Sequence, residues 1–179
     1  AKMWPVATLN VDADTVVLGD NADVLPALPD AAFQVIYIDP PFNTGVRRSH
    51  APITVTRDEA GDRTGFGGVR YVTERGESRA YDDAFDDYPA FLAPRLREAR
   101  RLLAASGTLY LHVDPRESHY CKVLCDQIFG RDAFLNEVIW AYDFGGRARD
   151  RWPRKHDTIL VYVRTPDAHF FDQDAVERI

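Results

Sequence analysis

The feature that most restricts the fold of this chain is the segment Phe33–Ile38, a largely apolar and β-branched run in which hydrophobic and polar residues do not alternate. A run of this kind is typical of a strand that is buried on both faces, and such strands occur in parallel sheets covered by helices. The run stops at once at Asp39-Pro40-Pro41. The pattern therefore predicts an α/β protein in which a carboxylate follows the end of a buried strand.

The rest of the chain alternates short apolar runs with amphipathic segments, which predicts an open, mostly parallel sheet with flanking helices and at least one βαβ unit. Further strands are expected over Thr15–Asp20, Thr108–Val113, Phe134–Tyr142 and Thr158–Val163. Helices are expected over Asn21–Leu28, Tyr88–Ala104 and Pro115–Phe129. Between Asn43 and about Ala80 the chain is polar, rich in Gly and Arg and without periodicity. We expect a long polar loop there, at about 44–80, and loops of that length are usually functional.

Composition places the chain among globular proteins. Its 179 residues, 45% of them hydrophobic, predict one domain with a sizeable core and exclude collagenous, coiled-coil and disordered classes. No apolar run approaches the roughly 18 residues of a membrane span, and Ala1–Thr8 lacks the pattern of a secretory signal.

Cys121 and Cys125 are expected to be buried thiols in a reducing cytoplasm. His112 and His119 lack metal-ligand spacing, so we interpret them as a core-strand and a helix histidine and expect no metal.

Charge is distributed unevenly along the chain. The net charge of −6 argues against nucleic acid as a partner for the molecule as a whole. Gly145–Lys155, however, contains four Arg and one Lys against a single acid, and Thr44–Arg79 contains seven Arg against five acids. An acidic body with basic loops permits binding of a polyanion at one place, and a solvated basic loop is an equally weighted alternative.

The sharpest local feature is Asp39-Pro40-Pro41-Phe42. Ligands of open parallel sheets bind at the carboxyl ends of the strands, where both Asp20 and Asp39 are expected. The proline after Asp39 holds that residue extended, so that a carboxylate, two carbonyls and an aromatic ring are fixed close together. Such a group suits a flat heterocycle with an exocyclic amine. The alternatives are that Asp39 caps the next segment with Phe42 as core filler, and that Asp20 is an ordinary helix N-cap.

These residues resemble a known family. Leu18-Gly-Asp20-Asn21, followed by Val35-Ile-Tyr-Ile-Asp39-Pro-Pro-Phe-Asn-Thr-Gly45, is similar to amino-group DNA methyltransferases that use S-adenosylmethionine. The resemblance is to the permuted (beta) class, which includes the modification subunits of restriction systems. Similarity continues through four later segments: Phe91–Asp114, Glu117–Gly130, Phe134–Trp140 and Lys155–Tyr162.

The resemblance implies a partial Rossmann-like methyltransferase fold and methyl transfer to a base flipped out of double-stranded DNA. It assigns Asp39, Pro40, Pro41 and Phe42 as catalytic, with the Asp39 carboxylate and the Pro40 carbonyl binding the target amine. Phe42 would stack on the base, with Asn43 also binding substrate. Asp20 and Asp39 would contact the donor S-adenosylmethionine. Asp, rather than Ser, at the first motif position is associated more with adenine than with cytosine.

The same resemblance places the loop after Asn43 near the target base, and Arg147, Arg149 and Arg151 near DNA phosphates. No covalent enzyme intermediate is needed, in keeping with the lack of an activated cysteine. Other interpretations stay open: transfer to the cytosine amino group, transfer to an amine in RNA or protein, and a non-catalytic module of the same fold kept for DNA binding or assembly.

One departure from the family concerns the Phe-x-Gly-x-Gly loop that wraps the methionine part of the donor, which this chain lacks. Gly65-Phe66-Gly67-Gly68 does not follow an expected strand and does not fit. We therefore expect residues 1–179 to be the amino-terminal part of a methyltransferase catalytic domain, without its target-recognition region and donor-binding loop. Exposed sheet edges would then favour pairing with a second chain, a carboxyl-terminal half or another copy as a homodimer.

Overall fold

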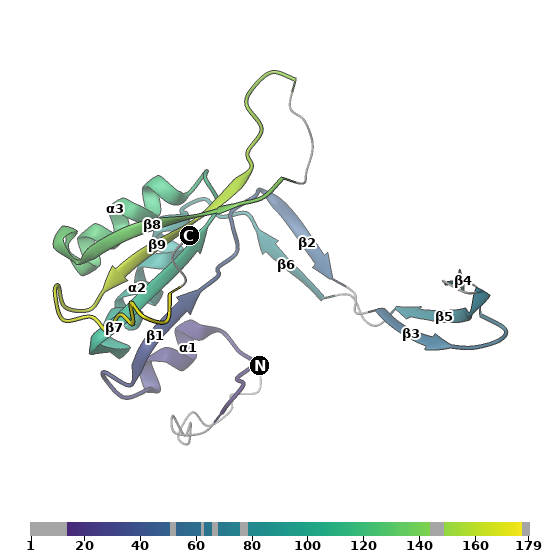
Figure 1. Ribbon diagram of the computed structural model, residues 1–179, viewed down its shortest axis with the longest axis horizontal. Coiled ribbons are helices and arrows are strands. Elements are labelled where there is room, and N and C mark those ends of the chain that lie inside the picture. Colours follow the sequence, from purple (N-terminus) through teal and green to yellow (C-terminus); the bar gives the residue numbers. More distant parts are fainter. Residues whose placement is uncertain are drawn as a thin grey trace. The chain divides into compact units, whose positions relative to one another are not determined.

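A computed structural model describes residues 14–50, 53–61, 63–65, 68–75, 79–143 and 149–176 (Figure 1). The chain divides into two compact units. Unit 1 comprises Ala1–Phe42 together with Asp87–Ile179, and unit 2 comprises Asn43–Asp86. Each unit has its own sheets and is described by itself.

Unit 1 is built on a four-stranded sheet in the order β1-β7-β9-β8 (Figure 1). The strands are β1 (Phe33–Ile38), β7 (Leu103–Val113), β8 (Phe134–Ala141) and β9 (His156–Val163). β1 and β7 are parallel, whereas β9 is antiparallel to both of its neighbours, β7 and β8. Three of the four strands thus run in the same direction, which confirms the α/β class and the mostly parallel sheet expected from the sequence.

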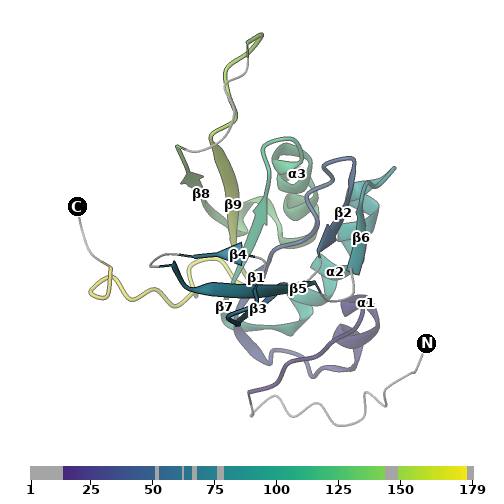
Figure 2. The ribbon, with the colours of Figure 1, turned by 90° about the vertical axis from the view of Figure 1, so that its right-hand side faces the viewer.

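Two helices cover one face of this sheet. α2 (Tyr88–Leu102) packs against β7, α3 (Ser118–Phe129) packs against β9, and the helices contact each other (Figure 2). The Asp87 side chain caps α2 by accepting the Ala90 N–H at 2.9 Å, and Gly130 (φ 97°) ends α3 before the short 3-10 helix η4 (Arg131–Ala133). The alternating inward residues of β7 are fully buried beneath these helices: Leu109, Leu111 and Val113.

The expected strand over Thr15–Asp20 is wrong. These residues are described but form no strand, and Val16 is 99% exposed. A strand is stable only as part of a sheet, and these residues belong to none of the sheets that the structure describes. The short helix that follows is confirmed as α1 (Asn21–Val24), continued by the 3-10 helix η2 (Leu25–Ala27), which contains Pro26.

Unit 2 replaces the expected long polar loop with strands. β2 (Val46–His50) pairs antiparallel with β6 (Arg79–Asp83), and β5 (Arg70–Arg75) lies between β3 (Ile53–Arg57) and β4 (Arg63–Thr64) in a second antiparallel sheet. The expectation of a long polar loop over about 44–80 is wrong, because strands were expected only where a sequence pattern indicated a buried face. β3 carries a short apolar–polar alternation, Ile53-Thr-Val-Thr56, but all of its residues are exposed, so pairing with β5 supports the strand without a buried face.

In the part of the chain that the structure describes, no helix is long and apolar enough to cross a lipid bilayer.

Candidate active site

Asp39 lies directly after β1, at the carboxyl ends of the two parallel strands. Its side chain is 61% exposed, and residues 39–44 contain no helix that it could cap. Phe42 is half-buried rather than part of the core, and its ring stands edge-on to that of His112 with centroids 5.3 Å apart. The alternative of a helix-capping Asp39 with a core-filling Phe42 is therefore wrong in the structure.

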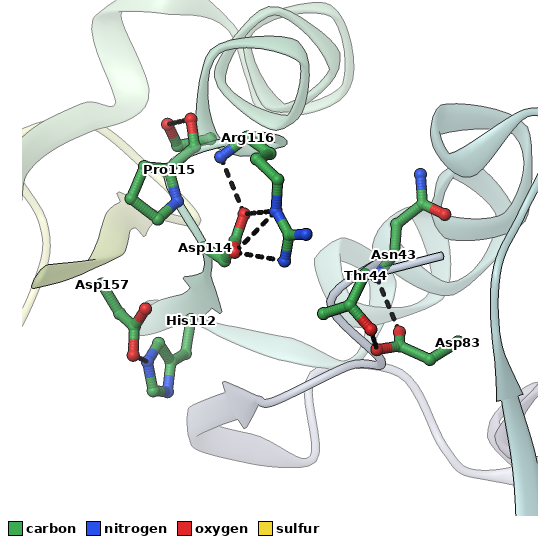
Figure 3. Close-up of polar contacts among 9 residues, drawn as sticks. Asn43, Thr44, Asp83, His112, Asp114, Pro115, Arg116 and Asp157 are labelled. Carbon is green, nitrogen blue, oxygen red and sulfur yellow. Dashed lines mark hydrogen bonds and ion pairs between the residues drawn. The ribbon is translucent and has the colours of Figure 1, made fainter. Parts of the chain in front are cut away.

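His112, on β7, has polar neighbours from both adjacent strands at this edge, and Figure 3 shows its ring beside Asp157. The parallel register pairs Ile38 with Leu111, so Asp39 and His112 are the next residues on neighbouring strands. The imidazole Nδ1 is 3.0 Å from the Tyr37 hydroxyl and 3.6 Å from Asp39 Oδ1, while Nε2 is 3.6 Å from Asp157 Oδ2. Burial, and in second place the charge of Asp39, raise the pKa of Tyr37. The imidazole thus lies between two carboxylates and a phenol.

Sequence reasoning missed three members of this group: Tyr37, His112 and Asp157. His112 was interpreted as a core-strand histidine, whereas it lies beside Asp39 on the sheet face opposite Leu111. The signal that could have found it is the expected parallel pairing of two buried strands, because equivalent positions at their carboxyl ends meet at one edge. Asp157 comes from the antiparallel strand β9, and nothing in its local sequence indicates the site.

A second strand-end carboxylate, Asp114, follows β7 and is bound differently. Its oxygens accept the Arg116 Nε–H at 2.8 and 2.9 Å, and Oδ1 also accepts the Arg116 backbone N–H at 2.7 Å (Figure 3). Asp39 has no equivalent backbone donor, because the corresponding residue is Pro41. The double proline therefore leaves the Asp39 carboxylate available to a ligand, whereas the Asp114 carboxylate is already bound by Arg116.

Asp20 caps α1, which is the alternative given for this residue, and it does not follow a strand as expected. Its Oδ1 accepts the Ala22 N–H and the Arg95 Nη2–H, both at 2.9 Å. The hydrogen bond from Ala22 and, after the opposing effect of burial, the Arg95 guanidinium hold the pKa of Asp20 below its ordinary value. Asp20 is thus an anion at neutral pH, fixed between a helix terminus and α2.

Asn43 begins unit 2, where it adopts a positive φ of 53°. Its backbone N–H donates to Asp83 Oδ1 at 2.7 Å (Figure 3). Its Oδ1 accepts the Phe85 N–H at 2.8 Å. Asp83, which is buried, also accepts a hydrogen bond from the Thr44 hydroxyl. These contacts order the start of the β2–β6 pair, which is a structural use of the residue expected to bind substrate.

None of the contacts described for Asp39, Phe42 and His112 involves Arg149 or Arg151. Arg149 and Arg151 are exposed, and Arg151 pairs with Asp150 at 2.7 Å, whereas Arg147 lies outside the described residues. Burial raises the pKa of the Cys121 thiol to about 12, and that of Cys125 further, so neither is a nucleophile. Among the described residues no cluster of His, Cys, Asp and Glu could hold a metal ion.

An exposed carboxylate at the carboxyl ends of parallel strands, beside an aromatic ring, defines a ligand site of an α/β enzyme. Comparison with known proteins gives the family. The sequence pattern of the family described as DNA methylase matches residues 33–178, and this chain belongs to that family.

The similar proteins include modification subunits of restriction systems. The chain is 28% identical over 166 residues to the type III restriction-modification enzyme EcoP15I Mod subunit of Escherichia coli, covering 85% of this chain and 24% of the relative. It is 32% identical over 151 residues to the StyLTI Mod subunit of Salmonella typhimurium, covering 82% and 23%. The chain therefore spans about a quarter of the length of these curated relatives.

A solved structure supports the fold. A protein of Thermus thermophilus, assigned as a DNA modification methylase, superimposes with a TM-score of 0.50 at 20% identity, over 87% of this chain and 55% of that one. At this identity the likeness establishes the Rossmann-like α/β fold.

Proposed function

We propose that this chain is part of a DNA methyltransferase that moves a methyl group from S-adenosylmethionine to the exocyclic amino group of adenine in double-stranded DNA. The observation that carries the proposal is the exposed Asp39 carboxylate beside the Phe42 ring, at the strand ends of a chain in the DNA methylase family. The aspartate at the first motif position favours adenine over cytosine.

The chemistry requires little more than orientation. The Asp39 carboxylate and the Pro40 carbonyl accept hydrogen bonds from the target amine, which aims the nitrogen lone pair at the methyl group. S-Adenosylmethionine supplies an activated methyl group when bound. Phe42 offers a ring face on which the flipped base stacks, since the amine is out of reach within the duplex. Asp20 would contact the adenine end of the donor, as the family resemblance implies.

The test is methylation by the complete protein with radiolabelled S-adenosylmethionine and a DNA substrate. Asp39→Ala should reduce transfer by at least about 100-fold, the effect of removing one positioned polar group from an active site. Its circular dichroism and Tm should match wild type because the side chain is exposed. Asp132→Ala, an exposed acid on η4, is the matched control. Transfer at the wild-type rate by Asp39→Ala would refute the catalytic assignment, and the labelled base would separate adenine from cytosine.

We further propose that Arg147, Arg149 and Arg151 contact DNA phosphates. Both described members of this group are exposed and carry guanidinium groups suited to phosphate. Changing all three to Ala should weaken binding to every DNA sequence and reduce the slope of log K against log[salt] by about 2 to 3. Arg131→Ala, which removes an exposed arginine of η4, is the control. An unchanged slope would make this segment an ordinary solvated loop.

The donor site, in this proposal, is completed by segments or a partner beyond these 179 residues. In the described sheet β1 is paired on one side only, and Val35 and Tyr37 on it are about half exposed. Equilibrium binding of labelled S-adenosylmethionine should therefore be much weaker for this chain than for the complete protein. Equal affinity would show that the donor site is already complete, and sedimentation would show whether a homodimer supplies the missing contacts.

We propose a cytoplasmic location, where DNA is accessible and two free buried thiols stay reduced.

A further inference from the structure

We propose that His112 is a positioning residue of this active site. Its imidazole fixes the Asp39 carboxylate and the Phe42 ring, and Asp157 fixes the imidazole from the other side. The proposal rests on the proposed function, because Asp39 and Phe42 are the groups assigned there to the target amine and base.

The contacts of the imidazole use both of its nitrogen atoms. Nδ1 lies within hydrogen-bond distance of the Tyr37 hydroxyl, and Nε2 faces the Asp157 carboxylate at 3.6 Å. A carboxylate can only accept, whereas a tyrosine hydroxyl can donate or accept. With Nε2 protonated toward Asp157, Nδ1 accepts from Tyr37 and makes no hydrogen bond to Asp39, whose Oδ1 is 3.6 Å away, so the imidazole limits the position of the Asp39 carboxylate by contact. This tautomer, inferred from the partners, sets the orientation of the ring.

Asp157 is itself held in place. Its side chain is only 20% exposed and lies on β9, on the same sheet face as His112. Burial and, after it, the charge of Asp157 raise the pKa of the Tyr142 phenol. A partly buried carboxylate needs donors, and Tyr142 and His112 are placed to provide them. Residues from three segments, Tyr37 of β1, Tyr142 after β8 and Asp157 of β9, thus support the His112 imidazole.

The outer side of the imidazole meets the two residues of the proposed chemistry. Nδ1 is 3.6 Å from Asp39 Oδ1, and the ring edge contacts Phe42 at a centroid distance of 5.3 Å and an interplanar angle of 63°. An edge-to-face contact of this kind orients an aromatic ring. His112 is 17% exposed, so it fills the space behind Asp39 and Phe42 rather than offering its own nitrogen atoms to solvent.

One polar atom of the group is incompletely satisfied. His112 Nε2 is buried and has no hydrogen-bond partner at normal distance among the described residues, because Asp157 Oδ2 stays 3.6 Å away. Active-site hydrogen bonds are often long without ligand and shorten in the complex. A long distance between Nε2 and Asp157 does not stabilise the fold, so a purely structural role does not explain it. It is expected for a positioning residue whose hydrogen bond to Asp157 shortens when the base binds.

The first test is steady-state kinetics of the complete protein. His112→Ala should reduce kcat by about 100-fold, the effect of misplacing a reacting group by about 1 Å. The KM for S-adenosylmethionine should change much less than kcat, by no more than about 3-fold, because Asp20, the other donor contact assigned, is untouched. His112→Asn, whose amide reaches the position of Nδ1, should recover more activity than His112→Gln, whose amide reaches toward Asp157. His119→Ala removes an exposed histidine of α3 and is the matched control.

The second test does not depend on activity. Crystal structures of the wild type and His112→Ala should show Phe42 and the Asp39 carboxylate displaced in the variant, with β1 and β7 unchanged. Identical positions of both groups would overturn the proposal, as would a wild-type kcat for His112→Ala. Equal loss of activity in the Ala, Asn and Gln variants, in parallel with loss of Tm, would indicate a merely structural histidine. Absence of methyl transfer in the wild type would instead refute the proposed function, and the crystal structures would still decide the role of His112.

Discussion

Tyr162 joins β9 to α3 through a buried hydrogen bond, and Tyr162→Phe should destabilise the chain measurably. The side chain is fully buried, and its hydroxyl donates to Asp126 Oδ1 at 2.6 Å, with the Lys122 carbonyl 3.2 Å away. A hydrogen bond to a charged group contributes about 1.5 to 3 kcal/mol. Asp126 retains Lys122 Nζ at 2.7 and 2.9 Å, which limits the damage. We therefore expect the free energy of unfolding to fall by about 2 kcal/mol.

The pH dependence gives this prediction a second, independent test. Burial raises the pKa of Asp126, but hydrogen bonds from Lys122 and Tyr162 outweigh burial and hold it below the ordinary value of 3.8. A lowered pKa stabilises the fold above the ordinary value, and this stabilisation is lost as pH falls through the lowered pKa. The variant loses one of the donors, so its difference from wild type should be full at pH 7 and should shrink below about pH 4.

Urea denaturation at about pH 7 and about pH 3 measures both effects. Tyr120→Phe removes the hydroxyl of an exposed tyrosine on α3 and should change the free energy of unfolding by less than about 0.5 kcal/mol. If Tyr162→Phe behaved like this control at neutral pH, the hydrogen bond would contribute no net stability. A loss that is the same at both pH values would show that the carboxylate of Asp126 is not involved.

Three further predictions concern the core and the helices. Leu111→Ala, at a fully buried position in the middle of the sheet, should cost about 2 to 5 kcal/mol by the same denaturation assay. Cys121 and Cys125 should resist alkylation at about pH 8 in the native chain and react in urea, since burial raises both thiol pKa values; rapid native labelling would contradict this. Arg95→Ala should speed hydrogen exchange in α1, because Arg95 donates to the side chains of Asn21 and Asp20 at 2.7 and 2.9 Å; unchanged protection would show that these contacts do not hold the helix.

The sequence predicted the strands and helices of unit 1, but the expectation that Phe33–Ile38 is buried on both faces is wrong, because no residue of β1 is buried and Val35 is 58% exposed. β1 has the bounds expected for it, and β7, β8, β9, α2 and α3 differ from expectation only at their ends. Prediction was wrong where stability depends on strand pairing rather than on burial. Thr15–Asp20 has strand-like composition but joins none of the described sheets, and β3 is paired in a sheet but has no buried face.

The site was predictable only in part, and the reason lies in register. The local sequence around Asp39 shows a rigid turn with a carboxylate and an aromatic ring, and it shows nothing of the residues behind them. His112 lies far along the chain from Asp39, and it meets Asp39 because Ile38 pairs with Leu111. A shift of the pairing by one residue would place the histidine on the opposite face of the sheet. The contact between Asp39 and His112 therefore depends on the register of the whole sheet, which the local sequence does not show.

The neighbouring strands β1 and β7 are each followed by Asp-Pro, and the residue after that proline decides whether the carboxylate has a partner. After β7 this residue is Arg116, whose backbone N–H closes a turn onto Asp114 Oδ1 while its guanidinium contacts both oxygens. After β1 it is Pro41, which has no N–H to close that turn and no cation to neutralise the charge. Asp39 keeps an exposed carboxylate whose neighbours are a phenol and an imidazole, and a carboxylate in that state can accept a hydrogen bond from an amine. Pro41 therefore supplies neither a backbone N–H nor a positive charge to Asp39, and the Asp39 carboxylate stays available to a ligand. The Asp114 carboxylate is instead occupied by Arg116 of the same chain.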